Sequence, residues 1–283
     1  MNELRATGTL AVAVGFLLFH AAPGFTESDD QRIKAMVQAG QFREAYEQSL
    51  DDGKPDLRRL ILTARTLLTT GMQSSDSYLR WYALRAAIPL HEGELAQSAR
   101  TLSHSADRYE QSLALEILGN GDPQGSRADF LAALDSPFRA VRLRALRGLA
   151  KLKDPTLSER FGTVLTGDVD PDLRCFAAKA LADSGAADAP LILHRALDDQ
   201  VRAVQEQTVL ALVQLHDGDL VPLIRRKLAS DPPEQRLGNI RIAALIPDRN
   251  LVGDLAPFFS DAEPEVRAFA AAAVLSILEQ TSP

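Results

Sequence analysis

Hydrophobic and polar positions alternate at helical spacing along most of the chain, in copies that recur every 31 or 32 residues. A complete copy starts with an apolar residue and an arginine, whereas the copies at Gln205 and at Gln235-Arg236 are degenerate. A small residue follows three positions after the arginine, and an apolar residue follows seven positions after it; the clearest copies start at Val141, Leu173 and Val266. Such spacing places these positions on one face of a helix. A period of this length predicts a stacked array of helical repeats rather than one closed globule.

Seven copies share this pattern, and we take the arginine position of each copy as its reference position. The reference positions are Arg80, Gln111, Arg142, Arg174, Gln205, Arg236 and Arg267. The small or polar residues three positions later are Ala83, Ala114, Ala145, Ala177, Thr208, Asn239 and Ala270. The apolar residues seven positions later are Ala87, Leu118, Leu149, Leu181, Leu212, Ala243 and Val274. Shorter apolar stretches at 130–134, 191–197, 220–228 and 251–259 precede four of these helices, so each repeat is predicted to be a helix, a turn and a second helix.

The turns of these repeats resemble those of the HEAT repeat family, including its short variant in phycobilin lyases. Proline in the first helix, aspartate in the turn and an apolar residue followed by arginine in the second helix carry the resemblance. The matching prolines are Pro190, Pro222 and Pro257, and the matching aspartates are Asp135, Asp198, Asp231 and Asp261, with Asp168 or Asp170 in the fourth copy. The resemblance covers about residues 77–278 and implies an all-α, right-handed α-solenoid of stacked HEAT-like helix pairs.

The reference arginine lies at the edge of the apolar face of its helix. From there it can reach the turn aspartate of an adjacent repeat, and a series of such contacts forms a ladder of hydrogen-bonded ion pairs along the stack. We therefore interpret these arginines and aspartates as architectural rather than catalytic.

Residues 25–72 are also helical in pattern but are out of register with the repeats. We expect an N-terminal helical cap there, with a second helix that ends at Asp52-Gly53 and a third from about residue 55 to 70. The stretch 40–45 resembles the turn of a tetratricopeptide hairpin, although a single copy is equally typical of a plain capping hairpin. The repeat array is then expected over 73–283.

Residues 1–24 have the pattern of a secretory signal peptide. Arg5 precedes an apolar run at 10–19, and small residues follow at 22–24. This run is too short to cross a bilayer of ~30 Å, and the alternative is a buried N-terminal helix. We expect an exported protein, periplasmic or extracellular, with no integral membrane span in the mature chain.

Composition and charge narrow the functional classes. Hydrophobic residues make up 46% of the 283 residues and aromatic residues only 6%, which fits close helix packing. A net charge of −7 argues against nucleic acid as a partner. Cys175 is the single cysteine, so no intramolecular disulfide can form, and we expect a packed thiol.

Motifs for catalysis or metal binding are weak. One His-Glu pair occurs, at 91–92, whereas His104, His194 and His216 have no second histidine three or four positions away. No nucleophile elbow, P-loop or dinucleotide-binding glycine motif is present. We therefore expect no catalytic residue, no metal and no cofactor.

A binding surface is predicted from the exposed columns of the second helices, which line the concave face of such solenoids. Basic residues dominate the column five positions after the reference, and aromatic residues recur in the column two positions after it. The residues that we expect to form a partner-binding groove are Tyr82, Arg85, Arg144, Arg147, Phe176, Lys179 and Arg241. The basic side chains would steer an acidic or extended polypeptide and the aromatic rings would anchor it. An ordinary solvated helix face is the alternative interpretation.

These observations predict a non-catalytic, exported scaffold or adaptor that docks a protein partner. The alternative is an accessory or lyase-like maturation factor that holds a modified protein or a cofactor. The strongly apolar stretch at 268–278 either covers the repeat before it or packs against a second copy, so a homo-oligomer through the C-terminal repeat is a further expectation.

Overall fold

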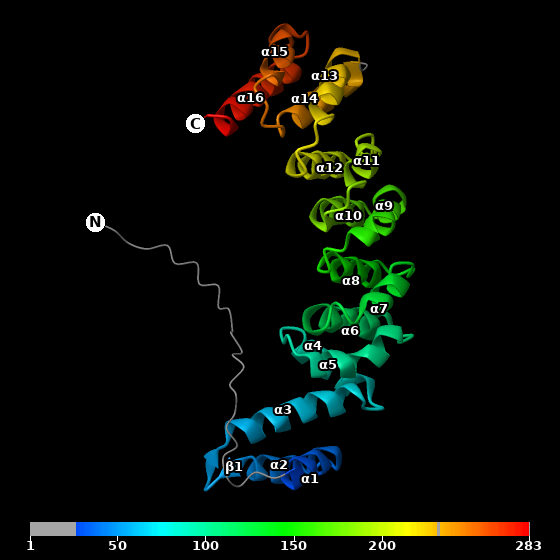
Figure 1. Cartoon of the computed structure of the whole chain (residues 1–283), viewed down its shortest axis with the longest axis vertical. Coiled ribbons are helices and arrows are strands. Elements are labelled where there is room, and N and C mark those ends of the chain that lie inside the picture. Colours follow the sequence, from blue (N-terminus) through cyan, green and yellow to red (C-terminus); the bar gives the residue numbers. More distant parts are fainter. Residues whose placement is uncertain (1–26, 231–232, 283) are drawn as a thin grey trace, which may run out of the picture. The chain divides into compact units, whose positions relative to one another are not determined.

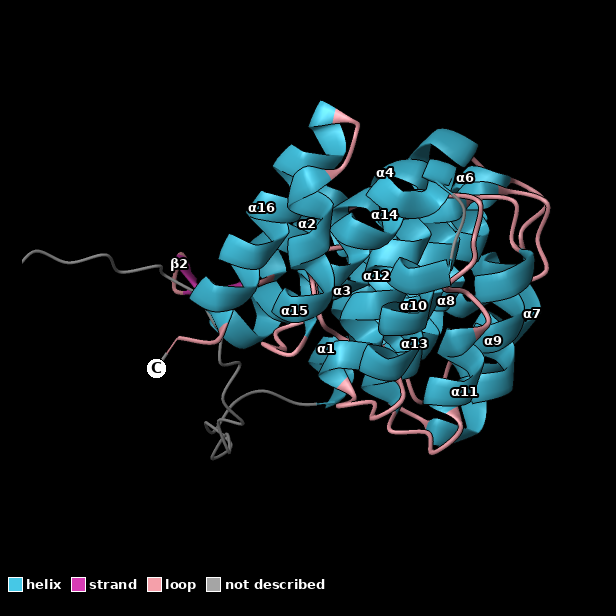
Figure 2. Ribbon diagram, turned by 90° about the horizontal axis from the view of Figure 1, so that it is seen from above, coloured by secondary structure: helices cyan, strands magenta, loops and turns pink. Residues whose placement is uncertain are grey.

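Helices dominate the part of the chain that the structure describes, which is residues 27–230 and 233–282 of a computed structural model (Figure 2). The signal-like segment at 1–24 and the predicted turn residue Asp231 lie outside the described residues. The chain divides into two compact units, Met1–Thr70 and Gly71–Pro283.

The first unit contains a helical hairpin, a short strand pair and most of a third helix. Its elements are α1 (Glu27–Gln38), α2 (Phe42–Gln48), β1 (Leu50–Asp51), β2 (Lys54–Pro55) and α3 (Leu57–Met72), which ends in the second unit. Our prediction that Asp52-Gly53 ends the second helix is wrong, because α2 already ends at Gln48. Asp52 and Gly53 instead have φ values of 48° and 75°. Two consecutive residues with positive φ form the tight turn that an Asp-Gly pair favours between antiparallel strands.

In the second unit, each reference position lies in a helix of its own. These second helices are α4 (Ser77–Ala87), α6 (Arg108–Gly121), α8 (Arg139–Ala150), α10 (Pro171–Ser184), α12 (Arg202–Gln214), α14 (Pro233–Ala243) and α16 (Pro264–Gln280). Shorter helices precede most of them: α5 (Gly93–Ala99), η1 (Arg100–His104), α7 (Arg127–Ala133), η2 (Pro155–Leu157), α9 (Ser158–Gly167), α11 (Ala189–His194), α13 (Leu220–Ser230), α15 (Leu251–Leu255) and η3 (Ala256–Ser260). In Figure 1, α6, α8, α10 and α12 follow one another along one side of the stack, with α7, α9 and α11 on the other. The predicted array of helix pairs is confirmed.

The predicted apolar columns form the core of this array. Leu173, Ala177 and Leu181 of α10 are fully buried, where α10 packs against α8, α9 and α12. Alanine in the middle column allows neighbouring helices to approach closely, and burial of apolar surface contributes about 25 cal/mol per Å² to stability. Two apolar positions differ. Leu79, before Arg80, is 53% exposed, and Val274 of α16 is only half-buried, with Ile277 fully buried instead.

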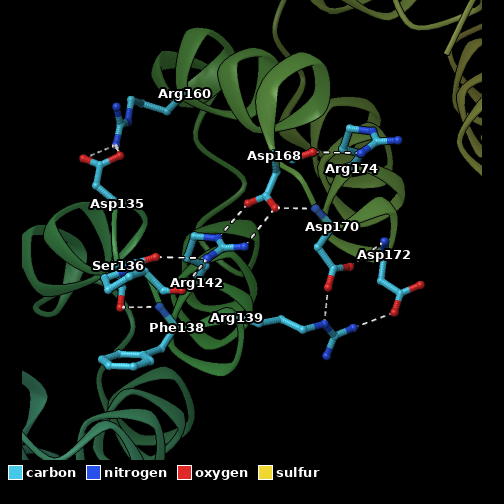
Figure 3. Close-up of polar contacts among 11 residues, drawn as sticks. Asp135, Ser136, Phe138, Arg139, Arg142, Arg160, Asp168, Asp170, Asp172 and Arg174 are labelled. Carbon is cyan, nitrogen blue, oxygen red and sulfur yellow. Dashed lines mark hydrogen bonds and ion pairs between the residues drawn. The ribbon is translucent and has the colours of Figure 1, made fainter. Parts of the chain in front are cut away.

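Ion pairs from the reference arginines join successive repeats (Figure 3). Arg142 donates from Nε and Nη2 to the two carboxylate oxygens of Asp168, at 2.8 and 3.0 Å, and Arg174 donates likewise to Asp199, at 2.8 Å twice. Arg174 also donates from Nη1 to the carbonyl of Asp168, at 2.8 Å. Each arginine therefore ties the turn before its own helix to the next turn along the stack. The predicted ladder is confirmed at Arg142, Arg174 and Arg236. Arg80 instead pairs with Glu110 of α6, at 2.7 Å.

The aspartates of the ladder are partly different from those we predicted. Arg142 pairs with Asp168 rather than Asp170, and Arg174 pairs with Asp199 rather than Asp198. Asp261 pairs with Arg236 at 2.6 Å, as expected. Asp198 is instead an exposed partner of Lys227. The ladder aspartates share a second contact, since each accepts the backbone N–H two residues on, at 2.8 to 3.0 Å. That turn orients the carboxylate toward the arginine.

Asp135 is the other predicted turn aspartate that stays outside the ladder. It pairs with Arg160 of α9, at 3.1 Å, and its side chain is mostly exposed (Figure 3). The prolines also differ from the mid-helix placement of the resemblance. Pro190 and Pro222 lie in the first turns of α11 and α13, where a missing N–H costs little, and Pro257 lies at the start of η3.

Acidification below about pH 4 is expected to destabilise the second unit. Burial alone would raise the pKa of Asp199, but the hydrogen bonds from Arg174 and from the N–H of Val201 outweigh it, so its pKa lies below the ordinary value. The N–H of Glu263 and the Arg236 side chain likewise lower the pKa of Asp261. A carboxylate of this kind contributes stability that is fully present above its unfolded pKa of about 3.9 and is lost as pH falls through its folded pKa.

Urea unfolding followed by circular dichroism between pH 7 and pH 2.5 measures this effect on the denaturation midpoint. The urea concentration at the midpoint should decrease as the pH is lowered below about 4. For Asp199→Asn this decrease should be shallower than for the wild type. A midpoint that is constant across the acidic range would contradict the lowered pKa values.

Two glycines provide a matched test of helix packing. A Cβ on Gly148 of α8 would lie 2.6 Å from ring atoms of Phe130, which is fully buried, whereas a Cβ on Gly238 of α14 would have nothing within 4 Å. Gly148→Ala is expected to lower the free energy of unfolding by about 1–2 kcal/mol through overpacking. Gly238→Ala is expected to raise it by about 0.5–1 kcal/mol, since alanine favours the helix interior. Urea unfolding of the two variants measures both changes in the free energy of unfolding. If the two changes had the same sign, the close contact of Gly148 with Phe130 would be ruled out.

Candidate functional site

The two exposed columns predicted to bind a partner meet between neighbouring second helices. The guanidinium of Arg147, in α8, lies 5.7 Å from the ring centre of Phe176, in α10. Arg241, in α14, lies 4.4 Å from the ring centre of Phe269, in α16. In both pairs the arginine lies five positions after the reference position of its own helix. The phenylalanine lies two positions after the reference position of the next second helix. This arrangement allows cation–π attraction and leaves the guanidinium edge free for other contacts.

Two of the predicted basic residues have carboxylate partners. Lys179 forms an ion pair with Asp183 one turn further along α10, at 2.8 Å. Arg144 of α8 pairs with Glu116 of α6, at 3.0 Å. The hydrogen bond from Gln214 and then that from Lys179 lower the pKa of Asp183, so this carboxylate is ionised at neutral pH. The predicted residues therefore do not form one continuous cationic surface.

A groove of about 560 Å³ lies among α4, α6 and α8, and we call it the α4–α8 groove. Aromatic and arginine side chains dominate its wall, chiefly Trp81, Arg85, Arg108, Tyr109, Phe138 and Arg144. A second groove of about 380 Å³ shares Trp81 and Tyr109 with it and also includes Tyr78 and Tyr82. Of the seven predicted residues, the structure thus brings Arg85 and Arg144 together in the first groove and places Tyr82 in the second.

Two arginines of this groove are stacked on rings. Arg85 lies 4.6 Å from the ring centre of Trp81. Arg108 lies 4.9 Å from the ring centre of Tyr109 and 5.4 Å from that of Phe138, and its Nη2 donates to the Tyr109 hydroxyl at 3.2 Å. Neither forms an ion pair with a carboxylate in the part of the chain that the structure describes. They differ in this respect from the ladder arginines Arg142 and Arg174.

Sequence reasoning missed Trp81, Arg108, Tyr109 and Phe138. Each lies outside the columns two and five positions after the reference, and the last three lie at or just before the start of a helix. A signal was present in the composition, because the only tryptophan and three of the four tyrosines of the chain fall between residues 78 and 109. The tyrosines Tyr78, Tyr82 and Tyr109 are 75%, 62% and 60% exposed. Exposed rings gathered in one place are typical of interaction surfaces.

The histidine and cysteine side chains are the candidates for metal ligands and for a reactive thiol. Within residues 27–230 and 233–282, no group of three histidine, cysteine, aspartate or glutamate side chains could hold a metal ion. His194 contacts Asp217 at 2.7 Å, and His104 contacts Asp129 at 2.9 Å. Burial, followed by the charge of Asp172, raises the pKa of the Cys175 thiol, which therefore stays protonated at neutral pH.

None of the described helices is both long and apolar enough to span a bilayer.

Comparisons with known proteins find similarity to solved structures alone. No family model and no curated protein matches the chain. One similar solved structure is the complex of CpcE and CpcF of phycocyanin lyase from Nostoc sp. PCC7120, with 20% identity, a TM-score of 0.48, and coverage of 77% of this chain and 93% of that chain. A designed armadillo repeat protein shows 16% identity and a TM-score of 0.42, covering 74% of this chain and 98% of that chain.

Human deoxyhypusine hydroxylase in complex with glycerol is similar too, with 18% identity, a TM-score of 0.34, and coverage of 88% of this chain and 99% of that chain. Values this low carry no functional assignment, so the architecture rests on the chain's own helices and contacts. Its helix pairs, aspartate turns and arginine ladder make the second unit an α-solenoid of stacked helix pairs.

Proposed function

We propose that the chain is a non-catalytic scaffold or adaptor, exported to the periplasm or the extracellular space, that binds a protein partner on its second helices. The observation that carries this proposal is the series of arginine–aromatic contacts on those helices. They involve Arg85 with Trp81, Arg108 with Tyr109, Arg147 with Phe176 and Arg241 with Phe269. They recur along the stack, and a repeated chemical group is suited to an extended partner.

The chemistry of these contacts favours a protein as the ligand. Arginine and aromatic residues are the side chains most often found where binding energy concentrates in protein interfaces. A guanidinium stacked on a ring keeps its N–H groups available to a carboxylate or a backbone carbonyl of the partner. With a chain net charge of −7, long-range attraction of a nucleic acid is disfavoured.

The experiment that tests this proposal is in-cell crosslinking followed by affinity purification and mass spectrometry. The test variant is Arg147→Glu/Arg241→Glu, which reverses two stacked arginines far apart along the array. The control variant is Arg195→Glu/Arg226→Glu, which makes the same charge change at two exposed residues at or near the first helices α11 and α13.

A partner that is crosslinked to the wild type and the control but lost from the test variant is the expected result. Equal recovery by both variants would exclude a role of Arg147 and Arg241 in binding the partner. Export is tested separately, by fractionation of cells that express the chain with and without residues 1–24. Recovery of both forms in the cytoplasm would contradict that part of the proposal.

The alternative function, a maturation factor that holds a modified protein or a cofactor, needs a pocket with reactive or titratable groups. The α4–α8 groove is walled chiefly by arginine and aromatic side chains, and Glu116 is the one acidic residue in its wall. This chemistry suits recognition better than covalent transfer, so we do not put the alternative forward as a second proposal.

A further inference from the structure

We propose that the α4–α8 groove is a specific docking site for an extended acidic peptide segment. Carboxylates of the segment bind Arg85 and Arg108, and an apolar or ring-bearing side chain packs on Trp81 and Tyr109. This inference rests on the proposed function and adds the class of partner and the place where it binds.

The charges of the groove support an acidic ligand. Four arginines and one glutamate line it, and Arg144 is paired with that glutamate, Glu116, at 3.0 Å. Arg139 is already occupied by Asp170 and Asp172 of α10 (Figure 3). The two remaining cations, Arg85 and Arg108, have rings as neighbours rather than carboxylates. The groove thus has an excess of positive charge, although the chain as a whole is acidic.

Stacking prepares these two guanidinium groups for a carboxylate. Each guanidinium lies over a ring, which restricts its motion, and both arginines line the groove. The planar fork of N–H groups matches the two oxygens of a carboxylate. Because the side chain is already oriented, less conformational entropy is lost on binding.

The shape of the site favours an extended segment over a compact ligand. Trp81 and Tyr109 belong to the wall of both grooves, so the two spaces of about 560 and 380 Å³ adjoin across these rings. Beyond them lie Tyr78 and Tyr82, both mostly exposed. A peptide that crosses the shared rings would have its acidic residues at the arginine end and apolar residues on the tyrosines.

The chain provides its own reporter for this site. Trp81 is the only tryptophan, so intrinsic tryptophan fluorescence of the full chain arises within the groove alone. The probe is a synthetic peptide of alternating glutamate and proline around one phenylalanine, which does not absorb where tryptophan is excited. Matched probes replace every glutamate with lysine or with glutamine, and oligothymidylate serves as the nucleic-acid probe.

We expect a saturable change in Trp81 emission with the glutamate peptide, weakened by salt, and little or none with the other three probes. In Arg85→Glu/Arg108→Glu the affinity should fall ~10-fold or more. Arg195→Glu/Arg226→Glu, which makes the same charge change at exposed residues outside the groove, should bind like the wild type. Arg85→Lys/Arg108→Lys keeps the charge and should bind more tightly than the glutamate variant, and circular dichroism checks the fold of each.

Several results would overturn the inference. One is an emission change that is as large with the lysine peptide or oligothymidylate as with the glutamate peptide. Another is loss of peptide binding in the Arg195/Arg226 variant but not in the Arg85/Arg108 variant. If the peptide fails to bind while the cellular partner still depends on Arg147 and Arg241, the groove inference falls and the proposed scaffold function stands.

Discussion

Asp199→Ala is expected to lower the free energy of unfolding by about 3 kcal/mol. Asp199 accepts two hydrogen bonds from Arg174 and one from the backbone N–H of Val201, each at 2.8 Å. The Arg174 and Asp199 side chains are only 12% and 11% exposed. Removal of the carboxylate leaves a largely buried guanidinium without its counter-charge and the turn without its acceptor, and both losses are costly. Urea unfolding followed by circular dichroism measures the change.

Asp198→Ala is the matched control for this prediction. Asp198 is the adjacent residue, is 76% exposed and contacts only Lys227 among the described residues. Its removal should change stability by less than about 1 kcal/mol, as is usual for an exposed ion pair. If both variants lost the same stability, Asp199 would have no special place in the ladder.

Ala177→Leu is expected to lower the free energy of unfolding by about 3 kcal/mol, near the upper end of the usual cost of overpacking. Ala177 is fully buried in α10, a helix that packs against α8, α9 and α12. The larger side chain has no space there, so the helices must separate or the leucine must adopt a strained rotamer. Thermal unfolding should show a lower midpoint for this variant.

Ala203→Leu is the corresponding control, since Ala203 lies exposed on α12. It should leave the midpoint close to that of the wild type, because leucine and alanine both favour helices. An unchanged midpoint for Ala177→Leu would mean that the alignment of the repeats is wrong.

The architecture of the second unit could be predicted because its information is local and repeated. Apolar residues at positions such as Val141, Ala145 and Leu149 must face a neighbour in every copy, so one register accounts for the burial of the whole array. The hairpin at Asp52 and Gly53 was missed for the opposite reason. It occurs once, and the same Asp-Gly pair can end a helix or join two short strands.

The choice of ladder aspartate could not be made from helical periodicity. Asp198 and Asp199 are neighbours in a turn, where the direction of each side chain depends on local backbone angles and not on a helical wheel. The structure reveals a rule: the ladder aspartate lies six residues before the next reference position, as Asp168 does before Arg174 and Asp199 before Gln205. At both positions the carboxylate also accepts the N–H of the second residue after it, a turn that other aspartates such as Asp170 form as well.

The candidate site was predicted in part. The columns of Arg147 and Phe176 were chosen from their helical positions, and the structure places these two side chains in contact. The stack of Arg108 is not predictable in this way, because Tyr109 and Phe138 lie at or just before the starts of different helices. Their proximity depends on how α6 and α8 are displaced along each other, which a single sequence does not specify. The contact of Arg85 with Trp81, four residues earlier in the same helix, is at helical spacing and could have been predicted.

Binding of a protein partner at the α4–α8 groove is tested most directly by site-specific photocrosslinking in the cell. A photoreactive phenylalanine analogue replaces Tyr109, in the groove, or Leu191, which is 64% exposed on α11. We predict a discrete protein adduct from position 109 that disappears when Arg85→Glu/Arg108→Glu is added, and none from position 191. The absence of an adduct at position 109, or adducts of equal yield from both positions, would contradict partner docking in this groove.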